Sequence, residues 1–98
     1  MITIQDPVVL GAALATIGGT VPNGVQRVFR AVGVRNPTAG TLTLVVTLAG
    51  TEIINRPVLA GKTDLCPELI GRGLNGGSNL QMSGASLTAG FTSLDTLI

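Results

Sequence analysis

The 98-residue sequence has the length of one domain, and we expect residues 1–98 to form a single fold with one modest core. Apolar residues make up 45% of the chain and charged residues only 11%, so part of the apolar surface is expected to face partner subunits. The net charge is +1 and the six basic residues are scattered, which argues against a nucleic-acid partner. There is no histidine, tryptophan or tyrosine and only one cysteine, so we expect neither an intrachain disulfide nor a metal site.

The longest uncharged stretch, from Pro7 to Gln26, predicts neither a membrane helix nor a secretory leader. Its dense apolar part ends near Ile17 and is too short to span a bilayer, and no basic run precedes it. We instead expect a strand from Val8 to Ile17 with a bulge or a bend at Gly11. Residues 1–7, ahead of that strand, are a candidate extended N-terminal arm.

Turn signals rich in glycine, proline and asparagine divide the rest of the chain at short intervals. This spacing is typical of an all-β domain, so the fold class that we predict is a single antiparallel β-sandwich of jelly-roll or immunoglobulin-like type, with about seven or eight short strands. The strands expected after the first are Val25–Arg35, Thr41–Leu48, Thr51–Asn55, Val58–Leu59, Asp64–Leu65, Leu80–Ser83 and Phe91–Leu97. No long helix fits between the breaks.

The clearest strand is Thr41–Leu48, in which every even position carries Leu or Val and the odd positions carry Thr or Val. Successive side chains of a strand point to opposite faces, so the even face is expected to lie in the core. Ala49-Gly50 is expected to form a two-residue hairpin loop to the next strand. Before this strand, Asn36 precedes Pro37, and we expect Asn36 to end the previous strand and to cap the turn.

The long strand Val25–Arg35 has no wholly polar face, which suggests that both of its sides are covered. Strict alternation places Arg30 on one face with Val28, Val32 and Val34, and places Phe29 on the other with Ala31 and Gly33. The exposed side of this strand, which carries Phe29, is expected to contact another subunit.

Few residues could carry chemistry. Gly71–Gly76 fits the loose pattern G-x-G-x-x-G, but it neither follows a buried strand nor opens a long helix, so we expect no nucleotide site. Glu68–Gly71 reads as one helical turn or a loop. No carboxylates are spaced as an acid–base pair, and Cys66 has no histidine to activate it. We expect Cys66 to be a small buried apolar residue, with a free thiol or an intersubunit disulfide as the alternatives. An enzyme, a cofactor and a small-molecule substrate are therefore not expected.

The order of the turn motifs resembles the small β-sandwich proteins of tailed-bacteriophage virions. The residues that carry this resemblance are Thr20-Val21-Pro22-Asn23-Gly24-Val25, Val32-Gly33-Val34-Arg35-Asn36-Pro37-Thr38, Asn55-Arg56-Pro57-Val58-Leu59-Ala60-Gly61-Lys62-Thr63 and Leu69–Ser83. The last strand departs from the family, which usually has Ser-Gly before the acidic residue that is Asp95 here.

The resemblance implies a non-enzymatic structural subunit of a virion, made in the host bacterial cytoplasm. Such a subunit would decorate the capsid or sit at the collar or head–tail junction, as a homo-oligomer that contacts the major capsid protein or portal and tail proteins. The expected contact residues are those of the segment Met1–Asp6 together with Phe29, Arg30, Arg35 and Val45. The alternative is a receptor- or carbohydrate-binding module of a fibre or cell surface, which the lack of Trp and Tyr disfavours.

Overall fold

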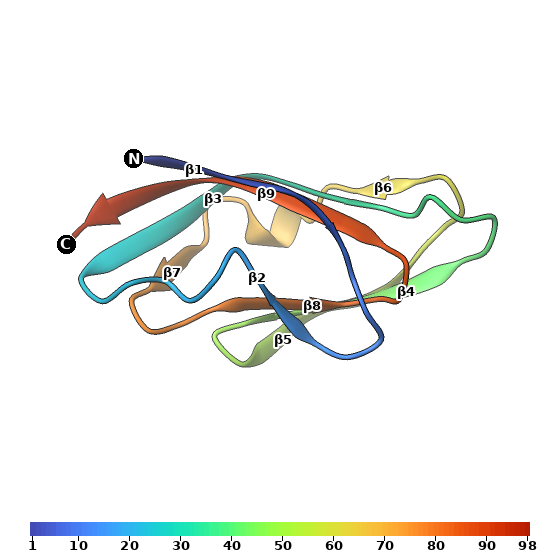
Figure 1. Cartoon of the computed structure of the whole chain (residues 1–98), viewed down its shortest axis with the longest axis horizontal. Coiled ribbons are helices and arrows are strands. Elements are labelled where there is room, and N and C mark those ends of the chain that lie inside the picture. The colour runs from blue at the N-terminus through green and yellow to red at the C-terminus, as the bar shows by residue number, and fades with distance from the viewer.

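The computed structural model describes all 98 residues and contains two antiparallel β-sheets, one 3₁₀ turn and no α-helix. The molecule measures 43 × 21 × 19 Å, and the strands run along its long axis (Figure 1). The elements are β1 (Ile2–Val9), β2 (Ala15–Ile17), β3 (Val25–Arg35), β4 (Leu42–Leu48), β5 (Thr51–Val58), β6 (Thr63–Asp64), the 3₁₀ turn η1 (Pro67–Leu69), β7 (Gly73–Asn75), β8 (Leu80–Ser83) and β9 (Thr88–Leu97). No helix in the chain has the length and apolar character needed to cross a membrane.

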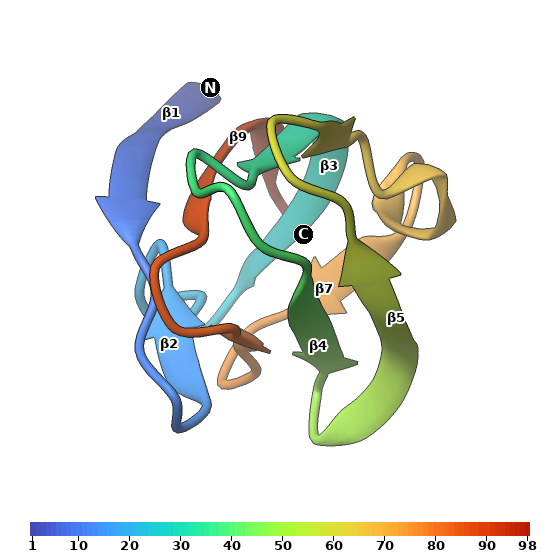
Figure 2. The ribbon, with the colours of Figure 1, turned by 90° about the vertical axis from the view of Figure 1, so that its right-hand side faces the viewer.

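The two sheets pack face to face as a β-sandwich, which confirms the predicted fold class. The first sheet has the order β1-β9-β3-β6, and β7 also pairs with β3; the second has the order β2-β8-β4-β5. Figure 2 shows the layers end on, with β1 and β2 on one side and β5 on the other. Every pair of neighbouring strands is antiparallel.

The core lies between the sheets and follows the alternation expected from β4. Leu44 and Val46 have no exposed area and Leu48 is 9% exposed, so the even face of β4 points inward as predicted. β4 pairs with β5 through the expected Ala49-Gly50 hairpin. Asn36 is fully buried at the end of β3; its amide donates to the carbonyls of Gly40 and Val58 and its side-chain oxygen accepts the N–H of Thr38. This turn cap is also as predicted.

The face assignment in β3 was wrong because the strand contains a β-bulge. Phe29 lies opposite Ser93 and Ala31 opposite Thr92, so Arg30 is an extra residue with no partner on β9. An extra residue reverses the alternation beyond it. The core-facing residues are therefore Phe29 before the bulge and Val32 and Val34 after it. Phe29 has no exposed area and packs edge-on against Phe91, with ring centroids 5.1 Å apart.

The N-terminal region also differs from the prediction. The expected strand Val8–Ile17 is two strands in different sheets, β1 and β2, joined by a loop that Leu10 anchors in the core. The expected arm, residues 1–7, is paired with β9 as an edge strand. The register of this pairing shifts between Gln5 and Val8, where the backbone of β1 crosses closely over Gly90. A Cβ at Gly90 would lie 2.9 Å from the carbonyl oxygen of Gln5, so glycine permits this close approach.

The segment between β6 and β8 is a short 3₁₀ turn followed by a strand that the sequence did not predict. Of the two alternatives for Glu68–Gly71, a helical turn or a loop, the structure has a helical turn, η1, and Gly71 after it has a positive φ of 81°. Gly73–Asn75 then forms β7, which pairs with β3 at Arg27. The G-x-G-x-x-G segment thus runs through a turn and a short strand, and no long helix follows it.

Candidate functional site

The exposed apolar side chains gather where β1 and the end of β9 lie side by side. The large apolar residues with the most exposure across the whole chain are Met1, Ile2, Ile4, Val9, Leu14, Leu59, Leu65, Ile70, Leu97 and Ile98. Five of these ten belong to the first four residues or the last two. Met1 and Asp95 exchange backbone hydrogen bonds of 2.7 and 2.9 Å, which places the two segments next to each other.

The register of β1 shows which of its backbone groups are free. Because Met1 and Asp95 exchange both bonds, they are a hydrogen-bonded pair of the antiparallel ladder, and such pairs alternate with non-hydrogen-bonded ones. Thr3 therefore bonds to β9, whereas the N–H and C=O groups of Ile2 and Ile4 point away from it, to the open edge. The side chains of Ile2 and Ile4 are 69% and 70% exposed on the outer face.

The second half of β1 is less available. Asp6 adds a charge, Pro7 lacks an N–H, and the bulge between Gln5 and Val8 interrupts the ladder. The carbonyl oxygen of Asp6 also accepts a bond of 2.8 Å from the side-chain amide of Gln5. We call the remaining part, Ile2–Gln5, the open edge segment.

The other sheet edges are short or protected. β2, β6 and β7 have two or three residues each. β5 is as long as β1, but it carries Glu52 and Pro57, and its pairing with β4 is bulged at Ile53. Charged residues, proline and bulges are the features by which natural sheets prevent edge-to-edge pairing. The open edge segment is thus the least protected edge of the molecule.

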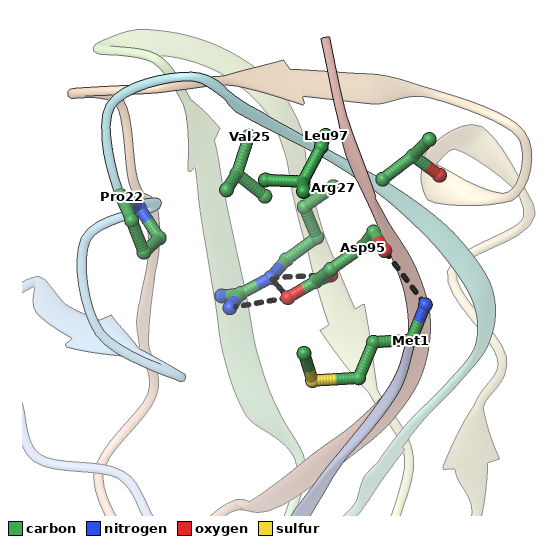
Figure 3. A pocket seen from close by; sticks show the side chains of 7 residues that line it. Met1, Pro22, Val25, Arg27, Asp95 and Leu97 are labelled. Carbon is green, nitrogen blue, oxygen red and sulfur yellow. Dashed lines mark hydrogen bonds and ion pairs between the residues drawn. The ribbon is translucent and has the colours of Figure 1, made fainter.

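Between Met1, the start of β3 and the end of β9 lies a pocket of about 500 Å³, lined by Met1, Pro22, Val25, Arg27, Asp95, Thr96 and Leu97 (Figure 3). At its base, Arg27 and Asp95 form an ion pair, with their side chains only 7% and 11% exposed. Nε and Nη2 of Arg27 donate to the Asp95 carboxylate at 3.0–3.3 Å, and Nη1 donates to the carbonyl of Gly18 at 2.9 Å. The pocket is lined by no aromatic ring on which a sugar could stack.

The Asp95 carboxylate is fully occupied by donors from three strands. Thr3 of β1 and Ser93 of β9 donate their hydroxyls to it at 2.9 and 3.0 Å, in addition to Arg27 of β3. Burial by itself raises the pKa of Asp95, but the hydrogen bonds from Arg27, Thr3 and Ser93 outweigh burial and hold the pKa below its usual value. An ionised carboxylate with its oxygens so engaged ties β1, β9 and β3 together and has no position left for a general base.

A second charged cluster lies on the opposite side, where Arg56 of β5 meets Asp64 of β6 and Glu68 of η1. Arg56 donates to Asp64 at 2.7 and 2.8 Å, and it also donates to Glu68. These bonds lower the pKa of both carboxyl groups and raise the pKa of Arg56. The Arg56 side chain is 36% exposed, so this cluster is a surface clasp between the two sheets.

Cys66 lies next to this clasp and is buried, as predicted, and it forms no disulfide within the chain. Its backbone N–H donates to Asp64 at 2.8 Å, and its φ of 45° is left-handed. Burial is the main cause that raises the pKa of the Cys66 thiol to about 12. The thiol is therefore protonated at neutral pH and is not a nucleophile. No group of three or more His, Cys, Asp or Glu side chains is placed to hold a metal ion.

The four predicted contact residues are not brought together. Phe29 belongs to the core and cannot take part in a contact between folded subunits, because the bulge at Arg30 turns it inward. Arg30 and Arg35 are exposed on β3 and form no ion pair within the chain. Val45 is half-buried on β4, in the other sheet.

The sequence indicated Met1–Asp6 as a contact segment, but the prediction of a loose arm missed that Ile2–Gln5 is an edge strand, although the signal for a strand was present. Ile2 and Ile4 alternate with Thr3 and Gln5, which is the period of a half-covered strand. The pairing of this segment with β9, about 90 residues away in the chain, is what distinguishes an edge strand from a loose arm.

The chain matches no protein-family model, no curated protein and no solved structure. Its function is therefore inferred from its own residues and geometry.

Proposed function

We propose that this chain is a non-enzymatic structural subunit of a tailed-phage virion that assembles with copies of itself on the capsid surface or at the head–tail junction. It is made in the host bacterial cytoplasm and becomes part of the particle, in contact with the major capsid protein or with portal and tail proteins. The motif order described above supports the phage assignment. The concentration of exposed apolar side chains at β1 and the end of β9 supports assembly, and it is the observation that carries the proposal.

The distribution of polar groups favours a structural role. Three of the five carboxylates, those of Asp64, Glu68 and Asp95, are held by arginines of the same chain. The hydroxyls of Thr3 and Ser93 donate to the Asp95 carboxylate, which is already ion-paired with Arg27, so this cluster serves to hold three strands together. Apolar surface removed from water contributes roughly 25 cal/mol per Å², and a symmetric assembly repeats that gain at each contact.

Mass spectrometry of purified virions tests this proposal. The particles are taken from the phage or prophage whose genome encodes the chain, and we expect the protein at a copy number that fits a ring or a capsid lattice. Its presence only in the lysate, with none in density-purified particles, would contradict a virion role. A catalytic turnover by the purified protein would contradict a purely structural one.

A further inference from the structure

We infer that the open edge segment of β1 pairs with the same segment of a second copy of this chain, joining two first sheets into one continuous antiparallel sheet. The inference deepens the proposed function and rests on it for the identity of the partner. It starts from the four backbone groups of Ile2 and Ile4, two N–H donors and two C=O acceptors, which β9 leaves unpaired.

These free groups are self-complementary about Thr3. In an antiparallel pair of identical strands related by a two-fold axis through Thr3, Ile2 of one copy lies opposite Ile4 of the other. Each Ile2–Ile4 pair then exchanges two hydrogen bonds, so four bonds satisfy all eight free groups. The outer faces of the two sheets stay on the same side, because paired residues point to the same face.

Registers shifted along the strand satisfy fewer groups. Placing Ile4 opposite Ile4 brings Ile2 against Asp6, whose carbonyl already accepts the side-chain amide of Gln5 and which stands in the bulge. Placing Ile2 opposite Ile2 leaves both Ile4 residues without partners. The Thr3-centred register is therefore the one that the geometry favours.

The side chains of this register also fit a second copy. On the outer face, Ile2 lies opposite Leu94, and Leu94 lies opposite Val28, so an apolar row crosses three strands. Leu94 and Val28 are already half-buried. Pairing places Ile4 of the second copy next to Ile2, which extends the row into the other subunit. No charged side chain lies within the open edge segment to oppose this contact.

The size of the contact determines its expected strength. One short strand edge buries much less than the roughly 1,600 Å² of a standard interface, so two free copies associate weakly and reversibly. The same contact becomes effective where neighbouring contacts hold subunits side by side, since the local concentration is then high. This behaviour suits a subunit that assembles on a particle rather than in solution.

Sedimentation equilibrium of the full chain at up to about 1 mM, a range that detects weak specific contacts, tests the pairing. The decisive variant is Ile4→Pro. Its proline ring replaces an N–H that makes no bond within the chain and lies after a residue that is already extended, so the monomer should keep its fold. It removes two intersubunit donors per dimer, and we expect the association constant to fall about 30-fold or more.

Two further variants distinguish the contribution of the backbone hydrogen bonds to association from that of the apolar side chain. Ile4→Thr keeps the donor and the strand propensity but loses apolar contact, so we expect association only a few-fold weaker. Leu65→Thr is the matched control, because Leu65 is 67% exposed but lies in a loop far from β1 along the chain, and it should leave association unchanged.

An NMR measurement on the wild-type chain gives a test that does not depend on the fold of a variant. In a mixture of ¹³C-labelled and unlabelled copies, the Thr3 Hα protons of the two copies should give an intermolecular NOE, since directly opposed non-hydrogen-bonded residues have Cα atoms about 4.5 Å apart. Association that survives in Ile4→Pro, or that lacks this NOE, would overturn the edge pairing while leaving assembly intact. A wild-type chain that stays monomeric throughout the range would overturn the pairing and count against self-assembly, whereas the presence of the protein in virions is decided separately.

Discussion

The two long edge strands, β1 and β5, lie on opposite sides of the sandwich (Figure 2). They differ in how well their open edges are protected against pairing with another strand. β5 carries Glu52 and Pro57, contains a bulge, and is clasped by Arg56 to Asp64 of the other sheet. The open edge segment of β1 has no charge and no proline, and its ion pair, Arg27–Asp95, lies behind it in the interior. The comparison shows two uses of the few charged residues. Those at β5 protect an exposed sheet edge, whereas the Arg27–Asp95 pair stabilises the interior next to β1.

The largest effect on stability is expected from breaking the buried Arg27–Asp95 ion pair, which we call the internal brace. Asp95→Ala leaves the guanidinium of Arg27 buried without its counter-charge and removes the acceptor of Thr3 and Ser93. Removing one partner of a buried ion pair costs about 3–5 kcal/mol, so we expect a loss of that order in the free energy of unfolding, measured by urea denaturation.

Arg56→Ala, which breaks the surface clasp at β5, is the matched comparison. The Arg56 side chain is 36% exposed, so solvent screens its ion pairs and replaces them when they are lost. We expect a cost of about 1 kcal/mol or less in the same denaturation experiment. Equal losses in Asp95→Ala and Arg56→Ala would contradict the distinction between an internal brace and a surface clasp.

A second, somewhat smaller effect concerns the loop that contacts Arg27. Gly18 has a φ of 77°, and a Cβ at this position would lie 2.3 Å from the ring of Phe91. Gly18→Ala therefore combines a left-handed backbone with overpacking, and we expect a loss of about 2–4 kcal/mol. Gly19→Ala is the control, since Gly19 has a similar φ of 73° but open space around it. Comparable melting temperatures for the two variants would show that the contact with Phe91 is not a constraint.

The smallest effect is expected in the pH dependence of the free energy of unfolding. The pKa values of Asp95 and Asp64 are held below their usual range in the folded chain, so their contribution to stability is present above the ordinary carboxyl pKa of about 3.9 and is lost as the pH falls through the folded values. We expect the free energy of unfolding to decline below about pH 5. Asp95→Asn should flatten this decline, whereas Asp6→Asn, at a carboxylate without a side-chain partner in the chain, should not.

The sequence predicted those parts of the fold in which local pattern and tertiary environment agree. The alternation in β4, the hairpin at Gly50 and the turn that Asn36 caps through Thr38 and Gly40 each depend on a few neighbouring residues. The bulge at Arg30 could not be predicted, because nothing in the sequence of β3 distinguishes an extra residue from a paired one. Because of that single residue, Phe29 lies in the core and not on the surface as expected.

The candidate site was predictable only in part, for a related reason. Met1–Asp6 was recognised as a contact segment, but its conversion into an edge strand depends on β9, at the other end of the chain. The Arg27–Asp95 pair joins residues 68 apart, and no spacing rule connects them. That apolar side chains are exposed can be inferred from composition. To identify the sheet edge that carries them, one must know the order in which the strands pair.

The buried thiol of Cys66 can report how often the two sheets separate. It is the only thiol, it has no exposed area, and its high pKa keeps it unreactive while the layers are closed. A maleimide reagent can therefore label the chain only in conformations that have separated the sheets around η1, so the labelling rate measures how often they separate. If pairing at β1 stabilises the whole sandwich, labelling of Cys66 should slow as the protein concentration rises, which would report an event at one edge through an atom on the other side of the molecule.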